Sequence, residues 1–271
     1  MSWARRICRR GRTELFPLAS GFAKTKRAAM LPHPPLPSHY TRTEDKPVFV
    51  NQLFDAGAKH YDGINGWGFL GSGSFYRRWV QQRHGLKPGH HLLDVACGTG
   101  LMAVEAHRIL GTAENITCLD PSEGMLAVAR KKLPAKFVQG YADKLPLADA
   151  SFDFLTMGYA LRHVADLTTT FREYHRVLRP GGRVLILEVT KPKSRVGNFF
   201  FRLYFGKIYP GLTRLFTRSR AARDMMHYYW ETMDASVPPE TVLEAMRAAG
   251  FAEVKCARAM GLFSEYTAVK K

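Results

Sequence analysis

The sequence is poor in cysteine and lacks any long hydrophobic run. Four cysteines occur in 271 residues, and their spacing matches no zinc site. We therefore expect no disulfide framework and no metal site, and the cysteine content fits a reducing compartment. Apolar stretches such as 184–189 are far too short to cross a bilayer, which argues against an integral membrane protein.

Acidic residues are nearly absent from the first 30 positions, which carry eight Lys or Arg against the single Glu14. An arginine-rich, acid-poor leader resembles a mitochondrial transit peptide in composition. The alternative is an upstream start codon, with Met30 or the Pro-rich stretch 33–40 marking where the folded protein begins. On both interpretations we expect residues 1–45 to be a disordered leader and linker. The expected location is the cytoplasm, with attachment to a membrane surface left open, or the mitochondrial matrix if the leader is a transit peptide.

A second segment without acids, residues 195–223, carries seven Lys or Arg. It lies within a stretch, 191–235, that we interpret as a basic and aromatic insertion. Large apolar residues such as Phe199 and Leu215 alternate with the charges, which suits a membrane interface or the mouth of a lipid-binding pocket. The other interpretation is a helical excursion with a buried aromatic face. Nucleic acid is disfavoured as a partner because no RNA-binding motif accompanies the segment.

The most informative motif lies at residues 91–101, which read HLLDVACGTGL. The pattern predicts a strand, a tight glycine turn and a helix, and glycines let a ligand approach the main chain. A dinucleotide fingerprint would add a third glycine, which this turn lacks, and the carboxyl group of Asp94 disfavours a pyrophosphate and suits an ammonium group. One strand–helix unit further on, Asp120 ends a second predicted strand, where it can accept hydrogen bonds from ribose hydroxyls.

Strands alternate with helices along the rest of the chain, which predicts an α/β fold with a doubly wound, mostly parallel sheet. We expect one domain over residues 46–271, with a helical N-terminal cap at 46–80 and the helical insertion after the fifth strand. The turn at 180–182 is expected to lead into that fifth strand. The expected strands are 91–96, 115–120, 136–140, 152–158, 183–190, 252–258 and 264–270. The expected helices are 101–110, 122–133, 166–178 and 239–249.

The stretch LLDVACGTG resembles motif I of class I S-adenosylmethionine (SAM) methyltransferases, with Ala96 where the commonest pattern has glycine. The resemblance implies a seven-stranded sheet whose last strand is antiparallel, with SAM as the cofactor. It places adenine beside the residues that follow the third strand, here 142–143. The residues assigned to the cofactor on this basis are Tyr61, Asp94, Ala96, Gly98, Thr99, Gly100, Asp120, Pro121, Ala142, Asp143 and Gly158.

Three further segments are similar to the ubiquinone and menaquinone biosynthesis C-methyltransferases: FDAGAKHYDGIN at 54–65, YALRHVADL at 159–167 and LEVTKP at 187–192. The resemblance implies methylation of a ring carbon of a polyprenylated quinol. The chain departs from the family pattern at 160–164 and at Tyr141, which bears on the acceptor. A small-molecule O- or N-methyltransferase and a non-catalytic, lipid-binding scaffold subunit remain alternatives, and both a homodimer and a multi-enzyme complex remain open.

Two neighbouring side chains are the candidate catalytic groups. Arg162 follows the fourth strand, where its guanidinium could stabilise the phenolate that forms on the acceptor or hold a water that takes the proton. His163 titrates in the useful range as a free side chain and is the candidate base, although a surface or supporting histidine is an equal interpretation. Tyr61 and Asp62 are expected to close over the cofactor as an N-terminal lid, or else to be a packing pair.

Overall fold

The computed structural model describes residues 29–271 apart from 41, 69–72, 218 and 260, so the basic leader up to residue 28 lies outside the described residues. Seven strands form one sheet in the order β3-β2-β1-β4-β5-β7-β6. The strands are β1 (Leu92–Val95), β2 (Ile116–Asp120), β3 (Lys136–Gln139), β4 (Phe152–Gly158), β5 (Leu178–Val189), β6 (Ala252–Ala259) and β7 (Phe263–Val269).

The sheet is parallel from β3 to β5, and β7 inserts antiparallel between β5 and β6. This confirms the doubly wound, mostly parallel fold and its antiparallel last strand. The chain runs from β1 outward to β3 and then returns to place β4 on the other side of β1, so the order reverses between β1 and β4. Ligands of such sheets bind beyond the carboxyl ends of the strands at this reversal.

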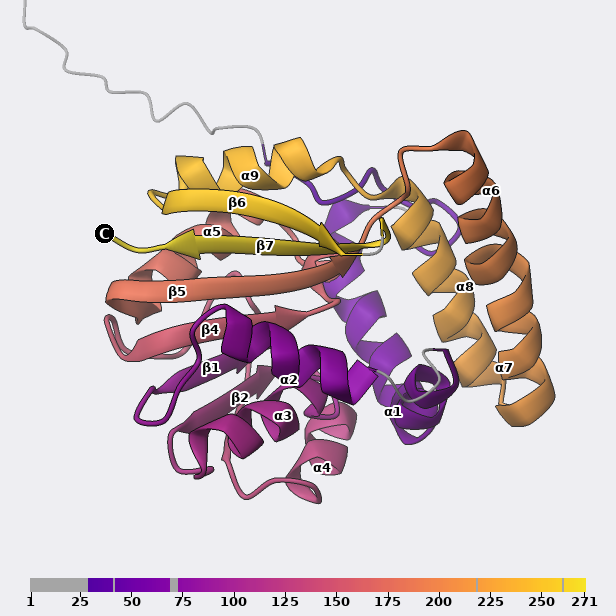
Figure 1. Cartoon of the computed structure of the whole chain (residues 1–271). Helices are drawn as coiled ribbons and strands as arrows, with labels where there is room; N and C mark the ends of the chain where they lie inside the picture. The colour runs from indigo at the N-terminus through magenta and orange to yellow at the C-terminus, as the bar shows by residue number, and fades with distance from the viewer. Residues whose placement is uncertain (1–28, 41, 69–72, 218, 260) are drawn as a thin grey trace, which may run out of the picture.

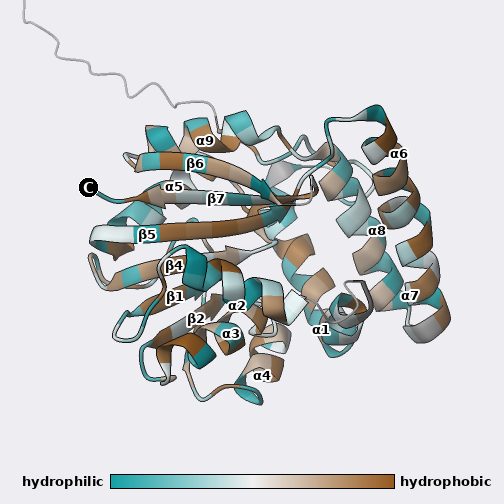
Figure 2. Ribbon diagram, viewed as in Figure 1, coloured by the Kyte–Doolittle hydropathy of each residue, from teal (hydrophilic) through white to brown (hydrophobic). Residues whose placement is uncertain are grey.

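Helices cover both faces of the sheet, because the central strands are apolar on both sides. In β1, Leu92 packs into one core cluster and Leu93 into the other, and both are fully buried. Figure 2 shows hydrophobic residues running along β5, whereas the surrounding helices mix hydrophobic and hydrophilic positions. One face carries α2 (Gly73–Arg83), α3 (Leu101–Leu110) and α4 (Glu123–Arg130), and the other carries α5 (Leu167–Val177) and α9 (Pro239–Ala248).

The beginning of β5 differs from the expectation. Phe152 pairs with Leu178 and Phe154 with Arg183, so the residues between Leu178 and Arg183 loop out of the ladder within the strand. Gly181 has a φ of 80°, which the glycine adopts without strain. The segment 180–182 is therefore an irregularity inside a longer strand and not a turn before it.

A third layer of helices lies beyond the carboxyl ends of the parallel strands (Figure 1). It comprises α1 (Lys46–Gly68), α6 (Arg195–Leu203), a π-helical segment (Tyr204–Ile208), α7 (Tyr209–Thr217) and α8 (Arg220–Ala235). Serine side chains cap two of these helices, since Ser194 accepts from the Gly197 N–H and Ser219 from the Ala222 N–H. Both the N-terminal cap and the helical insertion are thus present. No described helix is long and apolar enough to span a membrane.

The expectation of a disordered linker is wrong for its described part, which packs against the domain. The carbonyl oxygen of Met30 accepts from the Leu167 N–H at 2.9 Å, and that of Pro32 accepts from the Val237 N–H at 3.0 Å. His33 and Tyr40 are buried. A Pro-rich segment has few backbone conformations to lose on ordering, and its carbonyl oxygens remain good acceptors, so it can bind along the surface of a fold.

Candidate active site

The glycine turn after β1 exposes main chain without side chains at the carboxyl end of that strand. A Cβ atom added to Gly98 would meet nothing within 4 Å, whereas one added to Gly100 would lie 3.3 Å from Ala129 of α4. Gly98 therefore leaves space for a ligand, and Gly100 allows the two helices to pack. Ala96 has a φ of 51°, in the left-handed region that costs a non-glycine residue about 1–2 kcal/mol.

Asp120 ends β2 opposite this turn and is held in one orientation. One carboxylate oxygen accepts from the Gly98 N–H at 2.7 Å and the other from the Ser122 N–H at 2.9 Å. Burial raises the pKa of Asp120 to about 6, although these two hydrogen bonds act in the opposite direction. Each carboxylate oxygen retains acceptor capacity, so the group can receive hydroxyl donors from a ligand.

Two connected clefts open at the carboxyl ends of β1, β2 and β4. The space within them, counted out to the open solvent at their mouths, is about 490 Å³ and about 910 Å³. The first contacts α1 and α8 through Phe54, Tyr61 and Tyr229, and the second extends past β3 to Tyr141. The residues that line both are Val50, Ala96, Pro121, Ala160 and His163.

The structure brings most of the predicted cofactor residues to these clefts. Tyr61, Gly98, Asp120 and Gly158 line the first, and Ala96 and Pro121 line both. Ala142 and Asp143 line the second cleft. Three predicted residues, Asp94, Thr99 and Gly100, line neither of them.

Asp94 lies beneath the turn and is fully buried. One carboxylate oxygen accepts from the Thr156 hydroxyl at 2.8 Å, and the other makes no hydrogen bond of normal geometry among the described residues, although the nearby Ala103 N–H favours the ionised form. Burial raises the pKa of Asp94 to about 7. An unpartnered carboxylate oxygen behind an open glycine turn fits a ligand that carries an ammonium group, as SAM does, because a nearby cation would favour the ionised form.

The helix α1 is docked on the turn by two carboxylates. The Thr99 hydroxyl donates to Asp62, which also pairs with Lys132 of the segment after α4. Asp55 accepts from the Ser122 hydroxyl and from the Gly124 N–H at 2.8 Å. Since α1 thereby covers the starts of α3 and α4, its position is compatible with the expected lid, whose movement stays a prediction.

Arg162 is placed differently from the expected position at the mouth of β4. Its side chain is 4% exposed, pairs with Glu188 at 2.5 Å and donates to the Tyr159 carbonyl oxygen at 2.8 Å. It lines neither cleft, and its guanidinium lies 5.0 Å from the ring centre of Tyr229, which does. The ring of Tyr229 therefore separates Arg162 from the first cleft.

His163 forms part of the wall shared by the two clefts, between aromatic rings. Its ring stacks on Tyr228 and Tyr229 at centroid distances of 5.4 and 5.9 Å, and Phe54 meets it edge-on. Burial, with the charges of Arg162 and Lys46, lowers the pKa of His163 well below its usual value. The expectation that this side chain titrates in the useful range is therefore wrong, and the ring is neutral at physiological pH.

Lys46 is a residue that the sequence interpretation missed. Its side chain is 3% exposed, and its ammonium donates to the carbonyl oxygens of Arg162 and Val164 at 3.1 and 2.9 Å. Burial lowers the pKa of Lys46 to about 7. The first residue of α1 thus holds the loop that carries Arg162 and His163. Only the position of this lysine at the start of a predicted helical cap hinted at the contact.

Aromatic residues of the cleft were missed as well. Phe54 lies in the segment 54–65, which is similar to a known family, and Tyr229 lies in the insertion 191–235, but their helical spacing equally suits a core position. Tyr159 lines the first cleft with a φ of 61°, which makes it a second non-glycine residue of the site in the left-handed region. Backbone strain of this kind collects at functional sites.

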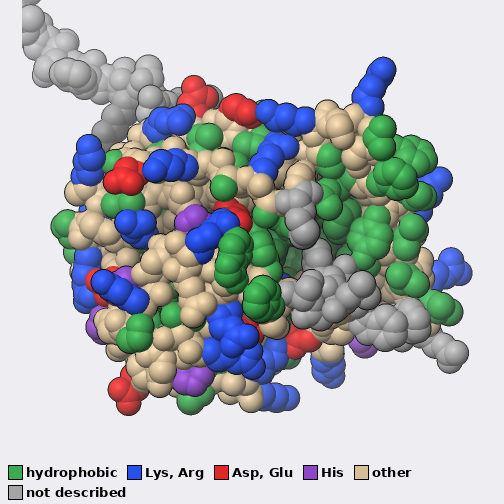
Figure 3. All heavy atoms as spheres, viewed as in Figure 1, with side chains coloured by type: hydrophobic (Ala, Val, Ile, Leu, Met, Phe, Trp, Pro, Cys, Tyr) green, Lys and Arg blue, Asp and Glu red, His purple; other side chains and the backbone are tan. Residues whose placement is uncertain are grey.

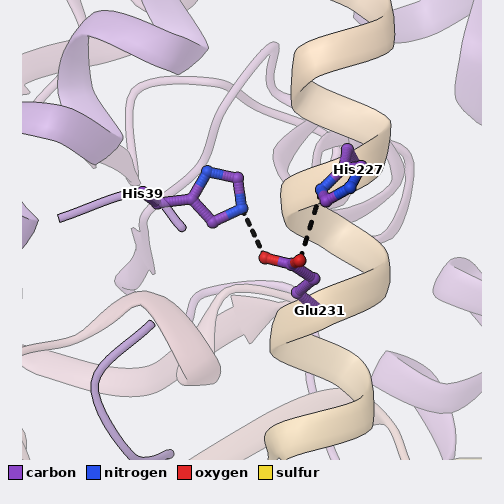
Figure 4. A group of neighbouring side chains, drawn as sticks. All are labelled: His39, His227 and Glu231. Atoms are coloured by element: carbon purple, nitrogen blue, oxygen red, sulfur yellow. Dashed lines mark ion pairs between the residues drawn. The ribbon is translucent and has the colours of Figure 1, made fainter. Parts of the chain in front are cut away.

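A separate polar cluster lies outside the clefts (Figure 4). His39 pairs with Glu231 of α8 at 2.6 Å, and His227, one helical turn before Glu231, approaches it at 3.6 Å. The three groups offer ligand atoms within 4.8 Å of one another. His39 is distant in the sequence from His227 and Glu231. The expectation of no metal site considered only cysteine spacing, so it stays a prediction. The His39–Glu231 pair fastens the N-terminal segment to α8.

Comparison with known proteins identifies the family. The model of the ubiE/COQ5 methyltransferase family matches residues 40–270. The chain is 36% identical over 221 residues to a demethylmenaquinone methyltransferase of Symbiobacterium thermophilum. This alignment covers 78% of this chain and 87% of that protein. It is 32% identical over 218 residues to the ubiquinone/menaquinone biosynthesis C-methyltransferase UbiE of Shewanella halifaxensis, with 78% and 86% covered.

A solved structure shares the fold. Phosphoethanolamine N-methyltransferase 2 of Haemonchus contortus, in complex with S-adenosyl-L-methionine, superposes with a TM-score of 0.58 at 18% identity, over 87% of this chain and 61% of that chain. Together with the seven-stranded sheet, the matching family model and the relatives identify the chain as a SAM-dependent methyltransferase. Within that class, the chain belongs to the ubiE/COQ5 methyltransferase family.

Proposed function

We propose that this enzyme transfers a methyl group from SAM to a ring carbon of a lipophilic quinol. The named activities of the relatives support the acceptor class. The observation that carries the proposal is the character of the first cleft, whose α1 and α8 wall is formed by uncharged apolar and aromatic side chains, among them Val50, Phe54 and Tyr229. Such walls suit a flat, uncharged ring.

The side of the clefts that is formed by the strand ends suits the cofactor. In the proposal Asp120 accepts the ribose hydroxyls, Asp143 lies near the adenine amino group and Asp94 receives the ammonium group through its unpartnered oxygen. Gly98 and Gly158 let the ligand lie against the main chain. A Cβ atom on Gly158 would come within 2.7 Å of Met102, so a larger residue would also disturb α3.

The bound cofactor supplies an electrophilic methyl group on a sulfonium. The protein positions the acceptor ring in line with it and excludes water, since the wall is aromatic. A ring carbon becomes nucleophilic when a neighbouring hydroxyl loses its proton. The positive charges that lower the pKa of His163 would equally favour an oxyanion placed against this wall. Arg162 thus acts in the proposal as a positioning and electrostatic group behind Tyr229.

The test uses SAM with a deuterated methyl group and short-tailed demethylated benzoquinol and naphthoquinol. We expect mass spectrometry and NMR to place the label on a ring carbon. Asp120→Ala should weaken SAM binding by about 1.5–3 kcal/mol, because it removes a charge-assisted acceptor. The matched control is Glu114→Ala, which removes an exposed carboxylate that lines neither cleft and should leave SAM binding normal.

Two results would overturn the proposal. If the label appeared on an oxygen or nitrogen of the acceptor, the reaction would be O- or N-methylation and not the proposed C-methylation. Transfer to neither quinol, by protein that binds SAM normally, would exclude the acceptor class. Unchanged SAM affinity in Asp120→Ala would remove that residue from the site without touching the acceptor assignment.

A further inference from the structure

We propose that the helix from Arg195 to Thr217 binds in the plane of an anionic phospholipid bilayer. The helix comprises α6, the π-helical segment and α7, which follow one another with helical backbone at both junctions. It lies at the outer edge of the molecule, on the side of α8 away from the sheet (Figure 1). This proposal goes beyond the methyl transfer reaction and does not depend on the acceptor.

Among the described side chains of this helix, six large apolar ones project into solvent, and two of them, Phe199 and Leu215, are 63% and 68% exposed. Figure 3 shows hydrophobic side chains gathered over this part of the molecule, with Lys and Arg side chains at their margin. The six residues are Val196, Phe199, Phe200, Ile208, Leu212 and Leu215. Contiguous exposed apolar groups on a protein surface indicate a binding face.

The π-helical segment aligns these residues. Each residue of an α-helix turns the chain by about 100°, so Val196 and Leu215 would lie about 100° apart on a regular helix. The π-helical segment accommodates one extra residue and removes about one such step, which places the two side chains in line. The buried positions Phe201 and Thr213 come into line by the same correction. The helix therefore has one continuous face toward the protein and one apolar face toward solvent.

Basic residues form a third stripe beside the apolar face. On the same corrected helix, Arg195, Arg202 and Arg214 lie within about 20° of one another and about 100° from Val196. All three are exposed, as is Lys207 within the π-helical segment. A narrow apolar stripe flanked by cations is the pattern of helices that lie in a membrane interface, where the cations meet anionic headgroups. The charge complementarity favours anionic lipid over a second, equally basic copy of this chain.

Arg202 already pairs with Asp234 at 3.3 Å and lies over the ring of Trp230, so it is left unchanged in the test. The full chain is sedimented with vesicles of phosphatidylcholine alone and with vesicles that contain phosphatidylglycerol. Arg195→Gln, Lys207→Gln and Arg214→Gln together should lower partitioning into the anionic vesicles about 100-fold at low salt. The matched control, Lys87→Gln, Lys131→Gln and Lys255→Gln, removes three exposed lysines outside the helix and should lower it less than tenfold.

A second variant, Phe199→Ser, Phe200→Ser and Leu215→Ser, tests the apolar stripe with all charges retained. We expect it to melt like the wild type, because the side chains are exposed, and to lose vesicle binding that persists at high salt. Equal binding of wild type and either variant would overturn the proposal. A wild-type dimer that the serine variant converts to monomer, without vesicle binding, would assign the face to a second copy instead.

Methyl transfer to a short-tailed quinol in detergent-free buffer separates this proposal from the previous one. Both variants should retain that activity, because their residues line neither cleft. Loss of vesicle binding with normal transfer supports the docking face alone. Normal vesicle binding with no transfer would contradict only the proposed acceptor.

Discussion

The two sides of the active cleft are built on different principles. On the β1–β3 side, short local motifs place glycine backbone and carboxylates at the strand ends, and the Gly98 N–H donates a hydrogen bond to the Asp120 carboxylate. On the α1–α8 side, buried cations are held by partners on other elements that no sequence motif links to them, as in Arg162 with Glu188 of β5 and Lys46 with two loop carbonyls. The first side can be recognised from spacing, and the second exists only in the folded chain.

The largest effect is expected on the side built from long-range pairs. Arg162→Ala leaves Glu188 buried without its cation, which should destabilise the protein by about 3–5 kcal/mol. Adding Glu188→Gln should recover most of that loss in urea unfolding, because no unpaired charge then remains. Single-turnover methyl transfer should stay about 10²–10³ below the wild type in both variants if the positive charge itself assists the reaction.

A different result would change the comparison. If the double variant recovered the rate together with the stability, Arg162 would serve only to neutralise the buried Glu188 carboxylate and would have no electrostatic role in the reaction. Unfolding of Arg162→Ala within about 1 kcal/mol of the wild type would mean that the pair is not a structural element of this side at all.

The pH dependence of folding should reveal Lys46. Its pKa is about 7 in the folded protein and higher in the unfolded chain, so the unfolded chain binds more protons between these values. The contribution of Lys46 to the free energy of unfolding therefore rises with pH, by about 1.4 kcal/mol per pH unit between about pH 7 and 10. In Lys46→Met that rise is absent, so the variant should lose stability relative to the wild type across this range.

Urea unfolding at a series of pH values checks this expectation. Lys59→Met removes an exposed lysine from the same helix and should leave the wild-type profile unchanged. Parallel profiles for wild type and Lys46→Met would show that the ammonium at the start of α1 is not buried in solution. The α1 docking would then rest on its other contacts, among them those of Asp55 and Asp62 and the hydrogen bond from the Tyr209 hydroxyl to the Ile64 carbonyl oxygen.

The sequence predicted the first side of the cleft well because its information is local. The order of strands and helices, the glycine turn and Asp120 follow from patterns a few residues long. The neutral ring of His163 could not be predicted, because its pKa depends on Arg162, on Lys46 and on burial between rings from two other helices. The packing of the Pro-rich segment depends on free N–H groups at Leu167 and Val237, far along the chain.

The smallest effect should appear on the local side, at Ala96. Its φ of 51° costs alanine about 1–2 kcal/mol that glycine does not incur, whereas glycine loses about 0.4–1 kcal/mol through greater freedom in the unfolded chain. Ala96→Gly should therefore be neutral or stabilise the protein by up to about 1.5 kcal/mol. Ala127→Gly, at an exposed position inside α4, lacks the strain and should destabilise by about 1 kcal/mol. Urea unfolding of the two variants, with SAM affinity unchanged in both, would show that the turn tolerates alanine at a measurable cost. A loss in Ala96→Gly equal to that in Ala127→Gly would mean that no strain is stored at the end of β1.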